Sequence, residues 1–188
     1  MLLCLGSAAW AETHSGTWGA LHWTLDNDGL LTISGSGAMN DIYINQEPNT
    51  WLAYRDDIVT AVLEEGVTSL GNRAFYRCTA LESVTLPASL TGPVGQNAFS
   101  LCSALTAIAA DPENTAYGSA DGVLFSKDGK TLIRCPEGKT GTYAIPAGVT
   151  DIDASAFGNR QGLTIIGFAG STAETYAQAH GFRFVPAV

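Results

Sequence analysis

The chain has 188 residues, with 18 acidic against 9 basic side chains and a formal net charge of −9 at pH 7. This charge repels polyanions, so the composition excludes a nucleic-acid binder that works through a basic surface. With 46% hydrophobic and 14% charged residues, the chain can bury a core and does not resemble a disordered protein. Its 21 glycines favour tight turns between short strands.

Residues 1–11 are similar in composition to the end of a secretory signal peptide. The run is apolar and ends in Ala9-Trp-Ala11, after which Glu12 begins the polar sequence. We therefore expect a truncated signal peptide and export; a buried strand or an ordinary apolar terminus is the alternative, which the missing basic residues favour. Cys4 lacks the small neighbours of a lipoprotein signal, and no later run reaches the roughly 18 apolar residues of a membrane span.

Residues 12–57 predict an N-terminal β-hairpin cap. Alternating strands at 21–25 and 30–34 flank Asp26-Asn-Asp-Gly29, a turn whose residues tolerate positive φ. The pair Asn49-Thr50 favours the start of a short helical turn over residues 51–54. Because the first rung of a solenoid otherwise exposes its core and a free strand edge, we expect this segment to cover it. The aromatic residues expected in this lid are Trp18, Trp23, Trp51 and Tyr54.

An internal repeat organises residues 58–170. Phe99 follows Phe75 by 24 positions, and Cys102 follows Cys78 by the same spacing. A whole structural unit has therefore been duplicated with its register kept. Each strand should turn its apolar positions into one stacked core, which the phenylalanine rings cover. The expected inward residues are Ile58, Ala61, Leu63, Leu81, Val84, Leu86, Leu105, Ile108, Leu163, Ile166 and Phe168.

Strand alternation predicts a second, outward face on the same strands. It consists of small, neutral side chains and should be flat. Its expected members are Thr60, Val62, Ser83, Thr85, Ala107, Ala109, Ile165 and Gly167.

Two further segments break the repeat. Within an insertion at 111–142, residues 121–126 and 131–135 predict a β-hairpin around an Asp-Gly turn, which we expect to form a longer rung. Residues 171–188 predict a C-terminal cap: Ser171 to Glu174 forms a capping box, Thr172 to His180 a helix, Gly181 its end, and 182–185 a strand.

The repeat resembles the BspA-like, Treponema-type leucine-rich repeat family of bacterial surface and secreted proteins. Its pattern Ile-Gly-x-x-Ala-Phe-x-x-Cys-x-x-Leu is matched closely by residues 70–81, with Leu70 for Ile. Residues 152–163 match loosely, with Asp153 for Gly and Arg160 for Cys. The resemblance implies a leucine-rich-repeat solenoid, mostly β with a short helical or irregular convex side, capped by the hairpin and by the helix and strand.

The repeat cysteines leave two interpretations open. Equivalent positions in adjacent rungs lie about 5 Å apart, which permits a disulfide between Cys78 and Cys102. A ladder of buried thiols explains the same pattern, and we favour it. Arg160 occupies the third equivalent position, and with Cys135 the chain after the leader holds an odd number of cysteines.

No metal, cofactor or catalytic site is predicted. His14, His22 and His180 are isolated, and the Asp26 to Gly29 segment is explained by its turn, without the closing Glu of a calcium loop. Adjacent acids at 56–57 and 64–65 point to opposite strand faces and do not form a catalytic pair. Further solvent-exposed side chains are expected at Arg73 and Arg77.

We therefore expect a monomeric, non-enzymatic protein, secreted or on a cell surface. The resemblance implies adhesion to a host or bacterial surface protein, or to a surface glycan. The alternative is a carbohydrate-binding module that uses N-terminal aromatic residues. The candidate ligand-binding residues are Tyr43, Trp51 and Tyr54, although burial in the lid explains them more simply.

Overall fold

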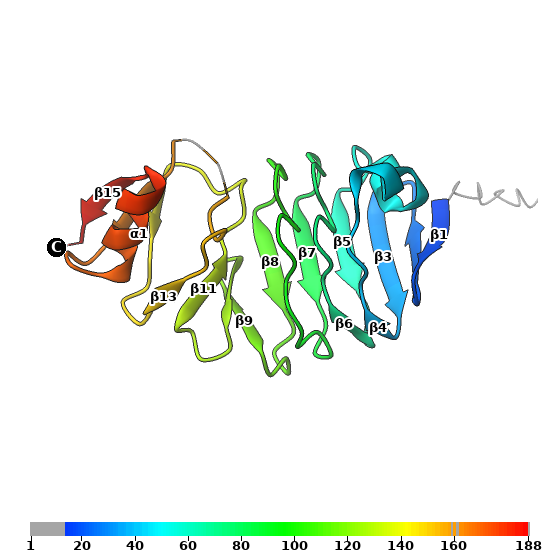
Figure 1. Ribbon diagram of the computed structural model, residues 1–188, viewed down its shortest axis with the longest axis horizontal. Helices are drawn as coiled ribbons and strands as arrows, with labels where there is room; N and C mark the ends of the chain where they lie inside the picture. The colour runs from blue at the N-terminus through cyan, green and yellow to red at the C-terminus, as the bar shows by residue number, and fades with distance from the viewer. Residues whose placement is uncertain (1–13, 159, 161, 188) are drawn as a thin grey trace, which may run out of the picture.

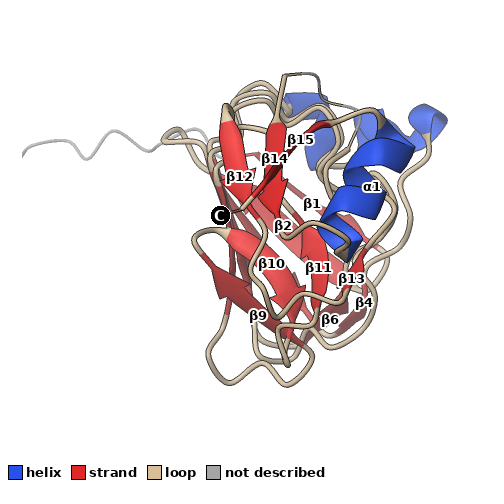
Figure 2. Cartoon of the chain, turned by 90° about the vertical axis from the view of Figure 1, so that its left-hand side faces the viewer, coloured by secondary structure: helices blue, strands red, loops and turns tan. Residues whose placement is uncertain are grey.

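The computed structural model describes residues 14–158, 160 and 162–187, so the expected leader lies outside the described residues. The chain is a leucine-rich-repeat β-solenoid of about 5 turns, as predicted, and is elongated along the stacking direction (Figure 1). Its helical segments lie along one side of the solenoid (Figure 2). They are the 3-10 turns η1 Ile44–Asn49 and η2 Trp51–Tyr54, and the α-helix α1 Thr172–His180. The strands are β1 His14–Trp18, β2 Leu21–Leu25, β3 Leu30–Gly35, β4 Gly37–Ala38, β5 Thr60–Leu63, β6 Val67–Ser69, β7 Ser83–Leu86, β8 Ala107–Ala110, β9 Tyr117–Ala120, β10 Val123–Ser126, β11 Thr131–Arg134, β12 Thr142–Ala144, β13 Asp151–Ile152, β14 Thr164–Gly167 and β15 Arg183–Pro186.

The largest sheet has six strands in the order β1-β2-β3-β5-β7-β8. The predicted hairpin is present as β2 and β3, which pair antiparallel, and an unpredicted strand, β1, pairs antiparallel with β2. Asp26 shapes the hairpin turn, because its Oδ1 accepts hydrogen bonds from the backbone N–H groups of Asp28 and Leu30 at 3.0 and 2.8 Å. From β3 onward the strands are parallel, so the hairpin leads directly into the repeats.

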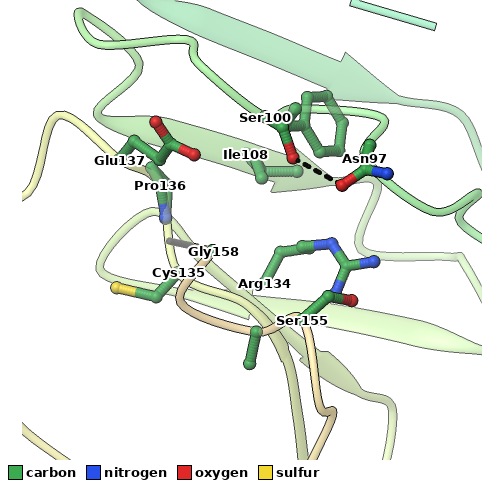
Figure 3. Close-up of a pocket in the computed structure, with 11 residues that line it drawn as sticks. Asn97, Ser100, Ile108, Arg134, Cys135, Pro136, Glu137, Ser155 and Gly158 are labelled. Atoms are coloured by element: carbon green, nitrogen blue, oxygen red, sulfur yellow. Dashed lines mark hydrogen bonds between the residues drawn. The ribbon is translucent and has the colours of Figure 1, made fainter. Parts of the chain in front are cut away.

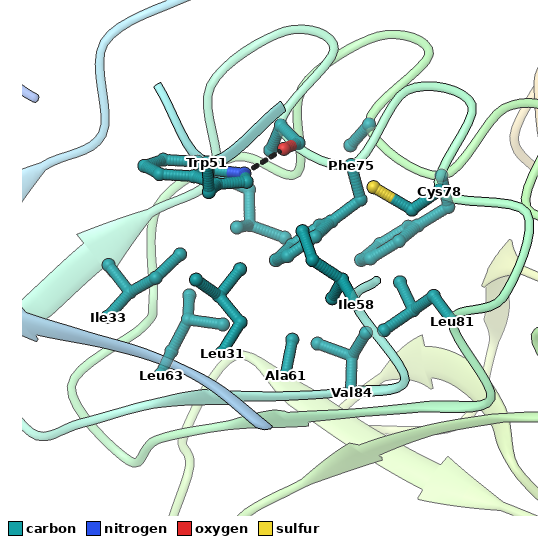
Figure 4. Packing of buried hydrophobic residues seen from close by; sticks show 14 of the residues in the cluster. Leu31, Ile33, Trp51, Ile58, Ala61, Leu63, Phe75, Cys78, Leu81 and Val84 are labelled. Atoms are coloured by element: carbon teal, nitrogen blue, oxygen red, sulfur yellow. Dashed lines mark hydrogen bonds between the residues drawn. The ribbon is translucent and has the colours of Figure 1, made fainter. Parts of the chain in front are cut away.

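The repeat core lies between this sheet and the turns that carry the phenylalanines. Phe75 and Phe99 are buried, and their rings stack with centroids 5.5 Å apart and planes 3° apart. Figure 4 shows Trp51 and Phe75 on one side of the core, facing aliphatic strand residues on the other. The predicted inward residues of the first three rungs are all buried: Ile58, Ala61, Leu63, Leu81, Val84, Leu86, Leu105 and Ile108.

Hydrogen bonds of polar side chains also connect successive rungs. The Asp41 carboxylate accepts hydrogen bonds from the backbone N–H and side-chain amide of Asn72, each at 2.8 Å. Asn72 Oδ1 in turn accepts the backbone N–H of Gln96 at 2.6 Å. The turns approach closely here: a Cβ on Gly95 would lie 2.4 Å from the backbone nitrogen of Asn72, so only glycine fits without a shift.

Asn114 fastens the insertion to the preceding rung. It is fully buried, and its amide nitrogen donates to the carbonyl oxygens of Pro87 and Leu90, both at 2.8 Å. Its Oδ1 accepts the N–H groups of Ala116 and Tyr117 at 2.9 and 2.8 Å. These bonds compensate the desolvation of a buried amide.

Strand β10 separates two hydrophobic cores. Leu124 belongs to the core of the first rungs, whereas Val123 and Phe125 belong to the core of the C-terminal rungs. The predicted hairpin of β10 and β11 is present, but β9 adds a third strand on the other side of β10. Asp121 and Gly122 both have positive φ and lie between β9 and β10, so the predicted strand begins later than expected.

The register predicted for the last repeat strand was wrong. Ile165 and Gly167 of β14 are buried, whereas Ile166 is only half-buried and Phe168 is 51% exposed. The reason is the C-terminal helix: a Cβ on Gly167 would lie 2.6 Å from Cβ of Ala173, so this side of the strand faces α1 and requires a residue without a side chain.

The C-terminal helix has the predicted bounds and ends at Gly181, whose φ of 73° is left-handed. The capping box was wrong in detail. The side chain of Ser171 makes no capping bond, and Glu174 Oε2 instead accepts the backbone N–H of Gly170 at 2.7 Å. Strand β15 then pairs parallel with β14, on the side opposite β12.

Candidate interaction surface

One row of side chains crosses all six strands of the large sheet on its outward face. Strand pairing places its members in sequence, one per strand, and strands are spaced about 4.8 Å apart. We call this row the sheet face. It contains no Asp, Glu, Lys or Arg, and its members are exposed or half-buried. They are Ser15, Thr24, Thr32, Val62, Thr85 and Ala109.

The predicted outward positions fit this surface in the first three repeat strands only. Thr60, Val62, Ser83, Thr85, Ala107 and Ala109 are exposed or half-buried. By contrast, Ile165 and Gly167 are buried, because β14 has the opposite register and lies in a separate sheet.

The three candidate aromatic residues do not form one exposed surface. Trp51 is fully buried, and its indole N–H donates to the carbonyl oxygen of Ala74 at 2.6 Å. Tyr54 is half-buried and stacks on His14 with centroids 3.8 Å apart. Tyr43 is 60% exposed. The Trp51 side chain is therefore part of the core and is not accessible to a ligand in this structure.

A small cavity lies between the turn that carries Phe99 and residues 155–158 of the third copy of the repeat (Figure 3). Its volume of about 20 Å³ has room for roughly one water molecule and excludes a substrate. Arg134, which is buried beside it, donates to Asp153 Oδ1 at 2.8 Å. Burial opposes ionisation of Asp153, but hydrogen bonds from Ser155 and Arg134 outweigh it and lower the pKa of this carboxyl. The pair stabilises the junction between rungs.

Comparison with known proteins identifies the repeats. The sequence model of a family described as "BspA type Leucine rich repeat region" matches residues 50–121. Residues 50–121 are therefore similar to leucine-rich repeats of the BspA type. No curated protein matches the chain.

Three solved structures with similarity to this chain are bacterial proteins. A leucine-rich repeat protein from Eubacterium ventriosum is 20% identical over 86% of this chain, with a TM-score of 0.40. The pneumococcal vaccine antigen PcpA is 24% identical over 59% of the chain (TM-score 0.46), and a leucine rich cell surface protein from Faecalibacterium prausnitzii is 17% identical over 82% (TM-score 0.35). The chain spans 64%, 34% and 70% of these three proteins, respectively.

The cysteines of the repeats are buried free thiols in the structure. Burial raises the pKa of Cys78 well above its ordinary value and that of Cys102 to about 12. Cys102 Sγ also donates to the carbonyl oxygen of Phe75 at 3.0 Å. At the equivalent position of the third copy, the Arg160 guanidinium donates to the carbonyl oxygens of Pro136 and Lys139 instead.

We predict that these thiols are unreactive in the folded protein. At pH 8, below the raised pKa values, the nucleophilic thiolate is scarce and access is blocked. A chain that begins at Glu12, purified from an oxidising compartment, should show almost no reactive thiol when folded and close to three when denatured, as measured with a chromogenic disulfide reagent. A single reactive thiol after denaturation would mean that Cys78 and Cys102 are bonded.

Several other titratable groups have structural partners. In the described ranges, no group of three or more His, Cys, Asp or Glu side chains could hold a metal ion. The adjacent acids at 56–57 and 64–65 lie outside the strands, contrary to the prediction, and Glu65 accepts the backbone N–H groups of Ala88 and Ser89 at 2.7 and 3.2 Å. Arg77 is exposed as expected, but Arg73 is not a plain solvent residue, because it binds Glu47 at 2.6 Å.

The described residues form the short helical segments η1, η2 and α1. None of their helices combines the length and apolar character that crossing a bilayer requires.

Proposed function

We propose that this chain is a secreted or cell-surface module that binds a protein on a host or bacterial surface. The contact would be made by the sheet face, without a reaction, metal or cofactor. The observation that carries this proposal is the row of uncharged, small side chains across six strands of a chain whose net charge is −9. Such a surface can approach a partner without desolvating charges, as the centres of protein interfaces do.

Export is the second part of the proposal, and residues 1–11 support it by their composition. The organism that makes this chain should release a protein whose N-terminal sequence begins at Glu12, as N-terminal sequencing of the secreted fraction would show. Retention of an intact N-terminus inside the cell would contradict export.

The binding test uses an array of host and bacterial surface proteins and surface glycans, probed with the purified chain. Thr32→Lys and Thr85→Lys each place a long charged side chain in the sheet face, and we expect each to weaken binding to any retained protein by about tenfold or more. Thr91→Lys is the matched control, because Thr91 is exposed in the loop after β7 and lies outside the sheet face. Equal binding by all three variants would mean that the partner does not contact the sheet face. Binding to glycans alone would favour the carbohydrate-binding alternative.

A further inference from the structure

A groove of about 280 Å³ opens on the turn side of the solenoid, away from the sheet face. Three successive rungs line it: Arg73 and Tyr76 come from the first phenylalanine turn, Leu101 from the second, and Glu137 and Arg160 from the insertion and third copy. The groove shares Asn97, Ser100 and Glu137 with the small cavity next to it, but unlike that cavity it is large enough for side chains of a bound peptide.

Leu101 is the feature of the groove that packing does not explain. Its side chain is 48% exposed, and its φ of 63° lies in the left-handed region, which disfavours leucine. Arg77 occupies the equivalent position one rung earlier with the same φ, so the turn itself does not require an apolar residue. An exposed leucine held in a strained conformation at a groove indicates a contact surface for a partner.

The charges at the groove favour an anionic partner. Arg73 shares the single carboxylate of Glu47 with Arg55, so one positive charge of this trio is uncompensated. Arg160 donates to backbone carbonyl oxygens and has no carboxylate partner among the described residues. Glu137 is the acid that lines the groove, and its Oε1 already accepts the backbone N–H of Leu101 at 3.1 Å.

The remaining side chain adds an aromatic surface. The Arg73 guanidinium lies over the Tyr76 ring, 4.1 Å from its centroid, which holds both groups in place at the groove. An apolar side chain can therefore contact Leu101 and Tyr76 while a neighbouring carboxylate meets the arginines.

We propose that this groove binds an extended peptide segment in which an acidic residue adjoins a large apolar one. The proposal rests on the proposed function in that the partner is a protein, and it adds a second contact on a different side of the solenoid. The volume suits a few side chains and not a folded domain.

The test probes the full chain with an array of six-residue peptides that combine Asp or Glu with Leu, Phe or Tyr at every pair of adjacent positions. A matched array replaces Asp and Glu by Asn and Gln. We expect acidic–apolar peptides to bind at least about tenfold more tightly than their amide counterparts, as measured by fluorescence anisotropy. If no peptide shows this preference, the proposal is wrong.

Two variants and a control locate the binding. Leu101→Asn removes the apolar contact while asparagine tolerates the left-handed φ, so folding should be kept and peptide affinity should fall about tenfold. Arg73→Gln should weaken the acidic peptides only, and Arg77→Gln, which removes an exposed arginine outside the groove, should leave affinity unchanged. Unchanged affinity of a folded Leu101→Asn variant would place the peptides elsewhere and overturn the proposal.

Two further experiments distinguish binding at the groove from binding at the sheet face, and a peptide ligand from an acidic glycan. Thr85→Lys should keep full affinity for the peptides. If this variant no longer binds the array proteins but still binds the peptides, the sheet face and the groove are independent binding surfaces. If polygalacturonate binds with a dependence on Leu101 and the acidic peptides do not, the groove is a glycan site and the peptide proposal fails.

Discussion

Phe99→Ala is expected to lower the free energy of unfolding by about 3–5 kcal/mol. The ring is 5% exposed and stacks on Phe75, so truncation leaves a cavity that the rigid neighbouring rungs cannot fill. Denaturant melts followed by tryptophan fluorescence measure the change.

Phe168→Ala is the matched control for this truncation. The same substitution removes the same atoms, but Phe168 is 51% exposed, so the loss should stay below about 1 kcal/mol. If the two variants lowered the free energy of unfolding by similar amounts, the result would favour the register predicted from the repeat and contradict the one observed in β14.

Deletion of residues 171–188 is expected to cause aggregation or loss of cooperative unfolding. It removes α1, whose Ala173, Tyr176 and Ala177 are buried, and uncovers Ile165 and Phe157. It also removes β15 and thereby leaves β14 with a free edge that can pair with another chain. Size-exclusion chromatography and thermal melts measure both effects.

Gln178→Ala tests whether any disturbance of the helix has the same result. Gln178 is exposed and bonds only Glu174 on the same helix, so this variant should remain monomeric with an unchanged melt. A truncated chain that behaves in the same way would show that residues 171–188 do not cap the solenoid.

The repeat core was predictable from the sequence because its contacts recur at fixed spacing. Phe75 and Phe99 lie 24 positions apart, and any duplicated unit that keeps this spacing brings such rings together. Thr50 was predictable for a local reason, since its side chain accepts the backbone N–H of Leu52 at 3.2 Å at the start of η2.

Other features depend on contacts between segments that share no pattern. The opposite register of β14 follows from the close approach of Ala173 to Gly167, which the repeat motif does not encode. The third strand beside β10 is β9, whose sequence Tyr117-Gly-Ser-Ala120 has weak strand character and does not indicate the pairing. The groove likewise combines Arg73, Leu101 and Arg160 from separate rungs, although the 24-residue spacing of Arg77 and Leu101 could have drawn attention to the unusual leucine.

The stacked rings of Phe75 and Phe99, with planes 3° apart, also bear on how such a chain can evolve. Each of these rungs meets its neighbours through the same ring, strand and backbone partners, so an additional copy of the 24-residue unit would find complementary surfaces on both sides. Unequal recombination within this stretch can therefore change the length of the exposed sheet in steps of one strand without creating a new interface. Strand β10 does not share this freedom, because its two faces contact different cores.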